Sequence, residues 1–63
     1  MLRLKIIGII PEFGLVYADD PITEMRYFMD HESDVNFNEL DVGTNILAEA
    51  NSEGYISKAR LEQ

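Results

Sequence analysis

The chain contains no cysteine and no tryptophan among its 63 residues. Without cysteine, a disulfide framework and thiolate metal sites are both excluded, which fits a reducing cytosol. No apolar run approaches the roughly 18 to 20 residues that a membrane-spanning helix needs. The apolar start of the chain is broken by Arg3 and Lys5 and lacks a signal-peptide cleavage pattern. We therefore expect a soluble, cytoplasmic protein with no segment in a membrane.

Basic residues are also scarce, because five of them stand against twelve acids and give a net charge of -7. Taken alone, this charge disfavours phosphate backbones and anionic membranes as partners. The positions of the charges soften that expectation, because most acids fall in expected loops. The bases fall instead in strand-like runs, at Arg3, Lys5, Arg26, Lys58 and Arg60. A local positive stripe on a negative protein is therefore expected.

Alternating and β-branched runs predict five strands, over residues 2–10, 13–18, 25–29, 45–50 and 55–61. Gly8 predicts a bulge or bend in the first strand. Pro11, the Asp19-Asp20-Pro21 run and residues 51–54 predict turns. Residues 30–41 predict a long connection with one helical turn, capped by Ser33 or Asp34.

Five short strands in one domain, residues 1–63, indicate an all-β fold. The most economical arrangement at this length is a small, five-stranded, partly open Greek-key barrel of the OB type, because closure removes most of the exposed sheet edges.

Enzymatic and metal chemistry have little support in the sequence. No nucleophile–base pair and no glycine-rich phosphate loop is present, so we expect no enzyme and no cofactor. The acidic spacing from Asp30 to Asn36 is similar to that of a calcium loop. However, Val35 replaces the required glycine, and Asp41 stands where a bidentate glutamate is expected. We therefore expect no metal site.

The second strand carries two sets of side chains that point to opposite faces. One set is large and apolar, and the other consists of Gly14, Val16 and Ala18. The small set suits a cramped interior, which predicts that the large set faces water: Phe13, Leu15 and Tyr17. The alternative is that the large set forms the core. An exposed apolar and aromatic row is a surface on which nucleic-acid bases stack.

The order of these signals resembles the cold-shock domain family. Residues 12–16, Glu-Phe-Gly-Leu-Val, resemble the last part of the family's second-strand motif, Lys-Gly-Phe-Gly-Phe-Ile. Residues 28–35 are similar to its third-strand motif, Val-Phe-Val-His-Phe, followed by Ser and an apolar residue. The later pattern is similar at Leu40, Gly43, Ile46, Leu47, Ala48, Glu49, Gly54, Ala59 and Leu61. The resemblance spans nearly the whole chain and implies an OB-fold barrel.

This resemblance implies a single-stranded RNA or DNA partner, bound on the face of the first three strands. In this hypothesis the stacking platform consists of Phe13, Leu15, Tyr17, Met29 and His31, of which the resemblance itself implies all but Tyr17, and the basic residues Arg3, Lys5, Lys58 and Arg60 would contact phosphates. The family's tryptophan is absent, and Leu15, Met29 and Glu32 replace other aromatic positions. Each base–aromatic stack contributes roughly 1–3 kcal/mol. The expected binding is therefore weak, with little sequence preference.

A second hypothesis uses the same barrel as an acidic protein-interaction domain. The net charge of -7 and the lost aromatic residues favour a partner with a basic surface, for which this chain would mimic nucleic acid or act as an inhibitor. His31 would then be an ordinary exposed residue. The basic side chains of the strands would serve as solvated edges that limit aggregation.

Overall fold

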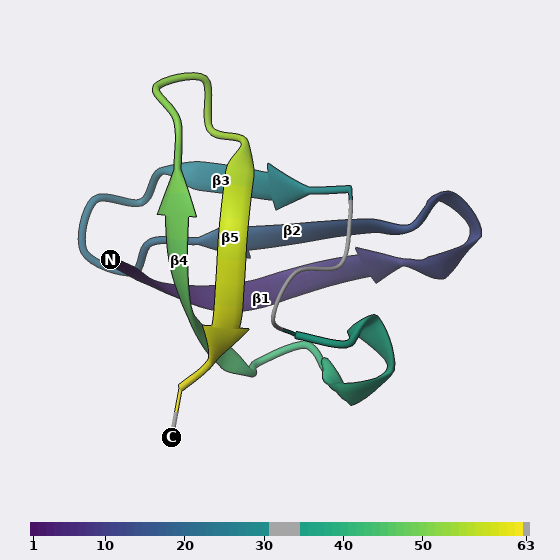
Figure 1. The fold of residues 1–63 in the computed structure, drawn as a ribbon. Coiled ribbons are helices and arrows are strands. Elements are labelled where there is room, and N and C mark those ends of the chain that lie inside the picture. The colour runs from purple at the N-terminus through teal and green to yellow at the C-terminus, as the bar shows by residue number, and fades with distance from the viewer. Residues whose placement is uncertain (31–34, 63) are drawn as a thin grey trace.

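The computed structural model describes residues 1–30 and 35–62, which form strands and two short 3-10 turns (Figure 1). The elements in chain order are β1 (Leu2–Ile10), η1 (Pro11–Phe13), β2 (Leu15–Asp19), β3 (Arg26–Met29), η2 (Phe37–Glu39), β4 (Asn45–Ala50) and β5 (Ile56–Leu61). The prediction of an all-β chain with five strands is confirmed. In the part of the chain that the structure describes, no helix is long and apolar enough to cross a membrane.

The five strands form one sheet in the order β3-β2-β1-β4-β5, with every neighbouring pair antiparallel. The sheet is strongly curved, so that β4 and β5 cross in front of β1, β2 and β3 (Figure 1). The two edge strands, β3 and β5, approach each other at an isolated parallel bridge between Phe28 and Tyr55. There the amide of Phe28 donates to the carbonyl of Gly54 at 2.9 Å. The sheet itself is not closed.

Strand β1 belongs to both layers, because its first half pairs with β4 and its second half with β2. The register with β2 shifts between Ile6, which faces Ala18, and Gly8, which faces Tyr17. Ile7 is therefore the extra residue of a β-bulge. The bulge or bend predicted at Gly8 is confirmed, and it lets β1 turn from one layer into the other.

The core lies between the two layers. Its fully or nearly fully buried apolar residues come from all five strands and from the connection before β4: Leu4, Ile6, Val16, Ala18, Tyr27, Met29, Val35, Leu40, Ile46, Ala48, Ile56 and Ala59. Val16 and Ala18 are completely buried, whereas Leu15 and Tyr17 are only partly buried. The small set of β2 therefore does fill the interior, and the large set faces outward as predicted.

Three local predictions need correction. Phe13 does not belong to the second strand: it ends the 3-10 turn η1, and Gly14 in a left-handed conformation (φ 60°) separates it from β2. Strand β3 begins at Arg26 rather than at residue 25, and β5 at Ile56 rather than at residue 55. The short helical turn of the long connection is capped by the Asn36 side chain. The expected caps Ser33 and Asp34 lie outside the described residues.

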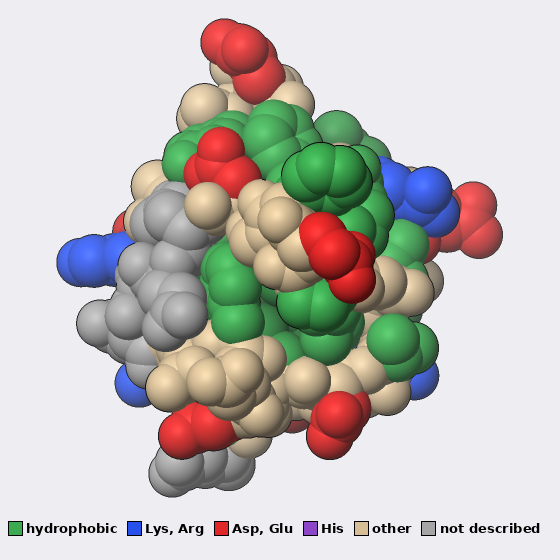
Figure 2. Space-filling view, turned by 90° about the vertical axis from the view of Figure 1, so that its right-hand side faces the viewer, with side chains coloured by type: hydrophobic (Ala, Val, Ile, Leu, Met, Phe, Trp, Pro, Cys, Tyr) green, Lys and Arg blue, Asp and Glu red, His purple; other side chains and the backbone are tan. Residues whose placement is uncertain are grey.

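One end of the molecule leaves apolar side chains uncovered. Figure 2 shows them gathered at the end that carries the β1–β2 turn and η2, with carboxylates around them. Phe13 on the β1–β2 turn and Val42 in the connection that follows η2 are 78% and 67% exposed. The acids Glu12, Glu39 and Asp41 on the same segments are exposed as well. This end is therefore an apolar surface with an acidic rim.

Candidate nucleic-acid interface

The outward face of β2 and β3 carries a row of residues that the strand register places side by side. Gly8 pairs with Tyr17, Tyr17 with Phe28, and Phe28 with Tyr55. We call these four residues the aromatic row. On the same face, Leu15 pairs with Ile10 one step towards the β1–β2 turn. Because side chains repeat every second residue, these side chains share one surface.

A polar row runs parallel to the aromatic row, two residues away on β2 and β3 and three residues away on β1, where the bulge adds one. It consists of Asn45, Lys5, Asp19 and Arg26, which pair in that order across β4, β1, β2 and β3. The two rows are about 6.6 Å apart, because a strand rises about 3.3 Å per residue. Positive Lys5 and Arg26 therefore flank negative Asp19, close to the rings of the aromatic row.

Asp19 and Arg26 form an ion pair on this surface. The Nε of Arg26 donates to Oδ1 of Asp19 at 3.0 Å, and Nη2 donates to Oδ2 at 3.5 Å. This hydrogen bond, with the attraction of the carboxylate, raises the pKa of the Arg26 guanidinium above its ordinary value. The two side chains are 65% and 30% exposed for Arg26 and Asp19. An ion pair with such access to water contributes only about 0–1 kcal/mol to stability.

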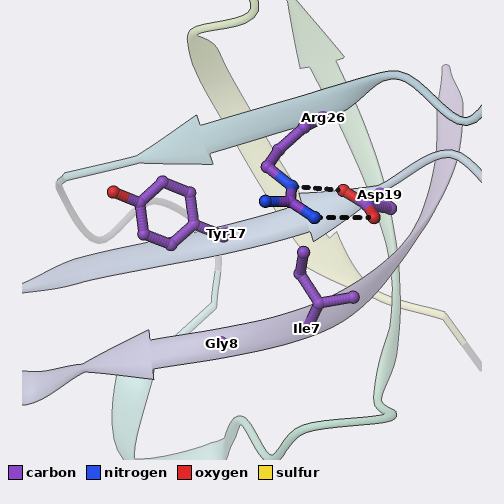
Figure 3. Close-up of a pocket in the computed structure, with 5 residues that line it drawn as sticks. All are labelled: Ile7, Gly8, Tyr17, Asp19 and Arg26. Atoms are coloured by element: carbon purple, nitrogen blue, oxygen red, sulfur yellow. Dashed lines mark hydrogen bonds and ion pairs between the residues drawn. The ribbon is translucent and has the colours of Figure 1, made fainter.

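A shallow pocket of about 420 Å³ lies between the two rows (Figure 3). Its lining residues are Ile7, Gly8, Tyr17, Asp19 and Arg26. Gly8 leaves space in the pocket beside the ring of Tyr17, because a Cβ at this position would lie 3.9 Å from Tyr17 Cδ2 and occupy that space. The pocket thus combines an aromatic ring, an aliphatic side chain and the Asp19–Arg26 ion pair, which places one cationic and one anionic group beside a ring on which a planar ligand can stack.

The edge of the aromatic row is held by contacts between β3 and the start of β5. The rings of Phe28 and Tyr55 pack edge to face with their centroids 5.3 Å apart. The hydroxyl of Tyr55 donates to Oδ1 of Asp30 at 2.7 Å. This hydrogen bond, together with desolvation and the negative charge of Asp30, raises the pKa of Tyr55 above its ordinary value. Tyr55, at the end of the row, is therefore held against the ring of Phe28 and the carboxylate of Asp30.

The predicted site residues separate into distinct groups in the structure. Leu15 and Tyr17 lie on the outward face of β2, and Lys5 lies on the same face of β1. Phe13 lies on the adjoining turn. Met29 was predicted on this face, but it is completely buried. Strand alternation explains the correction, because Tyr27 and Met29 point inward while Arg26 and Phe28 point outward. His31 lies outside the described residues.

Lys58 and Arg60 are not brought to this surface. Both are exposed on β5, where Lys58 pairs with Glu49 and Arg60 with Leu47. Because β4 and β5 cross over the other layer with the core between them, their outward face points away from Tyr17 (Figure 1). Arg3 lies on the outward side of β1, where its Nε is 2.6 Å from Oε2 of Glu62.

Reasoning from the sequence missed three residues of the site: Asp19, Arg26 and Phe28. A signal for Phe28 was present, since strand alternation places it on the same face as the charged Arg26. Asp19 was read only as part of a turn, although it is the last residue of β2. Its pairing with Arg26 depends on the register of β2 with β3, which the sequence does not reveal.

Comparisons with models of known protein families, with curated proteins and with solved structures found no match to this chain. Within residues 1–30 and 35–62, no group of three or more His, Cys, Asp or Glu side chains could hold a metal ion.

Proposed function

We propose that this chain is a non-enzymatic binding protein that holds single-stranded RNA or DNA weakly on the outward face of β1, β2 and β3. We further propose that its sheet is a small barrel of the OB type, similar to the cold-shock domain. The strand order β3-β2-β1-β4-β5 and the approach of β3 to β5 at Phe28 and Tyr55 support this architecture.

The observation that carries the proposal is the pair of neighbouring rows on this face. Tyr17 and Phe28 are directly paired across β2 and β3, and both side chains remain partly exposed. Lys5 and Arg26 lie in the polar row, which is next to the aromatic row on the same face. Single-stranded nucleic acids bind where rings can stack on bases while basic side chains follow the backbone. The rows supply both groups on one surface.

The expected affinity is low. Tyr17 and Phe28, aided by Leu15 and the exposed Phe13, offer few stacking positions, and each stacked base contributes roughly 1–3 kcal/mol. The net charge of -7 opposes a polyanion at low salt. We therefore expect dissociation constants in the micromolar range or above, where a 1 μM complex corresponds to about -8.2 kcal/mol.

The test is a fluorescence-anisotropy titration of labelled heptathymidine and heptauridine, with amide chemical-shift changes mapped along the chain. We expect saturable binding that weakens as salt rises, and shifts concentrated on β2 and β3. Replacing Tyr17 by Ala should cost roughly 1–3 kcal/mol of binding free energy, through the loss of one stacking position.

The matched control is Leu47→Ala, because Leu47 is also partly buried but lies on the outward face of β4. This variant should bind like the parent protein. No detectable binding at high micromolar protein and low salt would contradict the proposed function.

A second candidate function is supported by the apolar end with its acidic rim (Figure 2). Phe13 and Val42 could meet apolar groups of a partner protein while Glu12, Glu39 and Asp41 meet basic side chains. This alternative predicts a basic-surfaced protein partner and no oligonucleotide binding. Loss of partner binding in Phe13→Ala, with Tyr17→Ala unaffected, would distinguish it from the first.

A further inference from the structure

We infer that the carboxylate of Asp19 occupies the position on the Arg26 guanidinium at which a phosphate group of single-stranded nucleic acid would bind. Asp19 thereby sets how weakly this face binds the nucleic-acid backbone. The inference rests on the proposed function and deepens it, because it assigns a phosphate contact to Arg26 and an opposing role to its neighbour.

The geometry of the ion pair supports this role. Two nitrogens of the Arg26 guanidinium, Nε and Nη2, are directed at the two oxygens of Asp19. This is the fork-like arrangement in which arginine also binds phosphate oxygens. A carboxylate in this position therefore resembles the anion that the guanidinium would bind in a complex.

The surroundings show that a ligand could reach the same guanidinium. The Arg26 side chain is 65% exposed. Among the described residues, no partner is bonded to its third nitrogen, Nη1, which lies on the side of Tyr17 in Figure 3. A base stacked on Tyr17 would bring its own phosphate close to Arg26, because the aromatic and polar rows are about 6.6 Å apart.

The charge pattern of the polar row strengthens the argument. Asp19 stands between Lys5 and Arg26 in the cross-strand register, so one acid reduces the positive potential of two bases. Exposed ion pairs hold their partners weakly, so a phosphate can displace the carboxylate at little cost. The displaced Asp19 would nevertheless remain close and repel the bound phosphate.

The decisive variant is Asp19→Asn, which keeps the size of the side chain and removes its charge. In anisotropy titrations with labelled heptathymidine at about 0.15 M salt, where distant charges are screened, we expect affinity to rise about threefold to tenfold. The plot of log K against log salt should become steeper by about 0.7, the slope of one added phosphate contact on a single strand. A purely structural role for Asp19 would not change this slope.

The matched control is Glu49→Gln, which removes the same charge from the opposite side of the protein. Glu49 is an exposed acid that pairs across strands with Lys58, much as Asp19 pairs with Arg26. Its affinity should remain within about twofold of the parent, because exposed charges beyond roughly 8 Å are largely screened at physiological salt. The gain from Asp19→Asn should also disappear when Arg26 is replaced by Gln.

Each outcome decides the inference. Equal gains from Asp19→Asn and Glu49→Gln would attribute the effect to net charge and overturn it. Binding by the parent protein without a gain in Asp19→Asn would overturn it and leave the proposed function standing. If neither the parent protein nor Asp19→Asn binds the oligonucleotide, both the inference and the proposed function are overturned. Binding only by Asp19→Asn, or a gain that requires Arg26, would support the inhibitory role of Asp19.

Discussion

The two layers of the molecule share one core but present different outward faces. The β2–β3 face carries Leu15, Tyr17, Asp19, Arg26 and Phe28, whereas the β4–β5 face carries Leu47, Glu49, Lys58 and Arg60. The second face shows that this sheet can meet solvent with charged residues and a single leucine. The exposed rings of the first face are therefore not required by the fold. This contrast is why we propose a binding surface on β1, β2 and β3 rather than on β4 and β5.

The largest expected effect tests which side of β3 belongs to the core. Replacing the completely buried Met29 by Ala should destabilise the protein by about 2–5 kcal/mol, because it leaves a cavity. The neighbouring Phe28→Ala should cost less, roughly 1–1.5 kcal/mol, since it loses partial burial and one ring contact. Urea denaturation of both variants measures the difference.

A volume-conserving control keeps this test informative if Met29→Ala does not fold. Met29→Leu should cost less than about 1.5 kcal/mol, because it preserves most of the packing. A larger loss of stability in Phe28→Ala than in Met29→Ala would contradict the assigned orientation of β3.

An intermediate effect is expected where the two layers meet. Gly54 has a φ of 85°, and a Cβ there would lie 3.2 Å from the carbonyl oxygen of Arg26. Gly54→Ala should therefore destabilise the protein by roughly 1–3 kcal/mol, through backbone strain and a close contact with β3. Thermal unfolding monitored by circular dichroism would measure this loss.

Gly43 provides the control for backbone strain alone. Its φ is 97°, but a Cβ there would have no neighbour within 4 Å. Gly43→Ala should cost about 1 kcal/mol, which is the strain without the contact. Equal losses in the two variants would show that the approach of β5 to β3 does not constrain Gly54.

The smallest expected effect compares two lysines on opposite faces. Lys5→Gln should weaken oligonucleotide binding severalfold and reduce the salt slope by about 0.7, because Lys5 stands in the polar row. Lys58→Gln removes the same charge from the β4–β5 face and should change neither quantity appreciably. If Lys58→Gln had the larger effect, the binding surface would have to be moved to β4 and β5.

The sequence predicted the strands and the inner side of β2 because both depend on local patterns. The runs at residues 2–10 and 45–50 became strands with the expected bounds, and the bulge formed at Gly8. Val16 and Ala18 were correctly expected inside, since small residues suit a narrow core. These features follow from side-chain size and two-residue alternation within one segment.

The site was less predictable because it depends on contacts between segments. Met29 was assigned outward from a motif resemblance, whereas the alternation of β3 places Phe28 there. Lys58 and Arg60 belong to strand-like runs, but the curvature of the sheet turns their face away from Tyr17. The pairing of Asp19 with Arg26 results from strand register, which no single segment encodes.

The bulge in β1 has a consequence for where an empty space lies in the molecule. Leu4 and Ile6 point inward, so unbroken alternation would also place Gly8 inward and leave a gap in the core. The extra Ile7 shifts the phase of the strand by one residue. Ile9 then packs against the core, where it is partly buried, and Gly8 lies beside the Tyr17 ring. One extra residue in β1 thus places the empty space at the surface, where a ligand can enter it. Without that residue the space would lie in the core, where a cavity would reduce the stability of the protein.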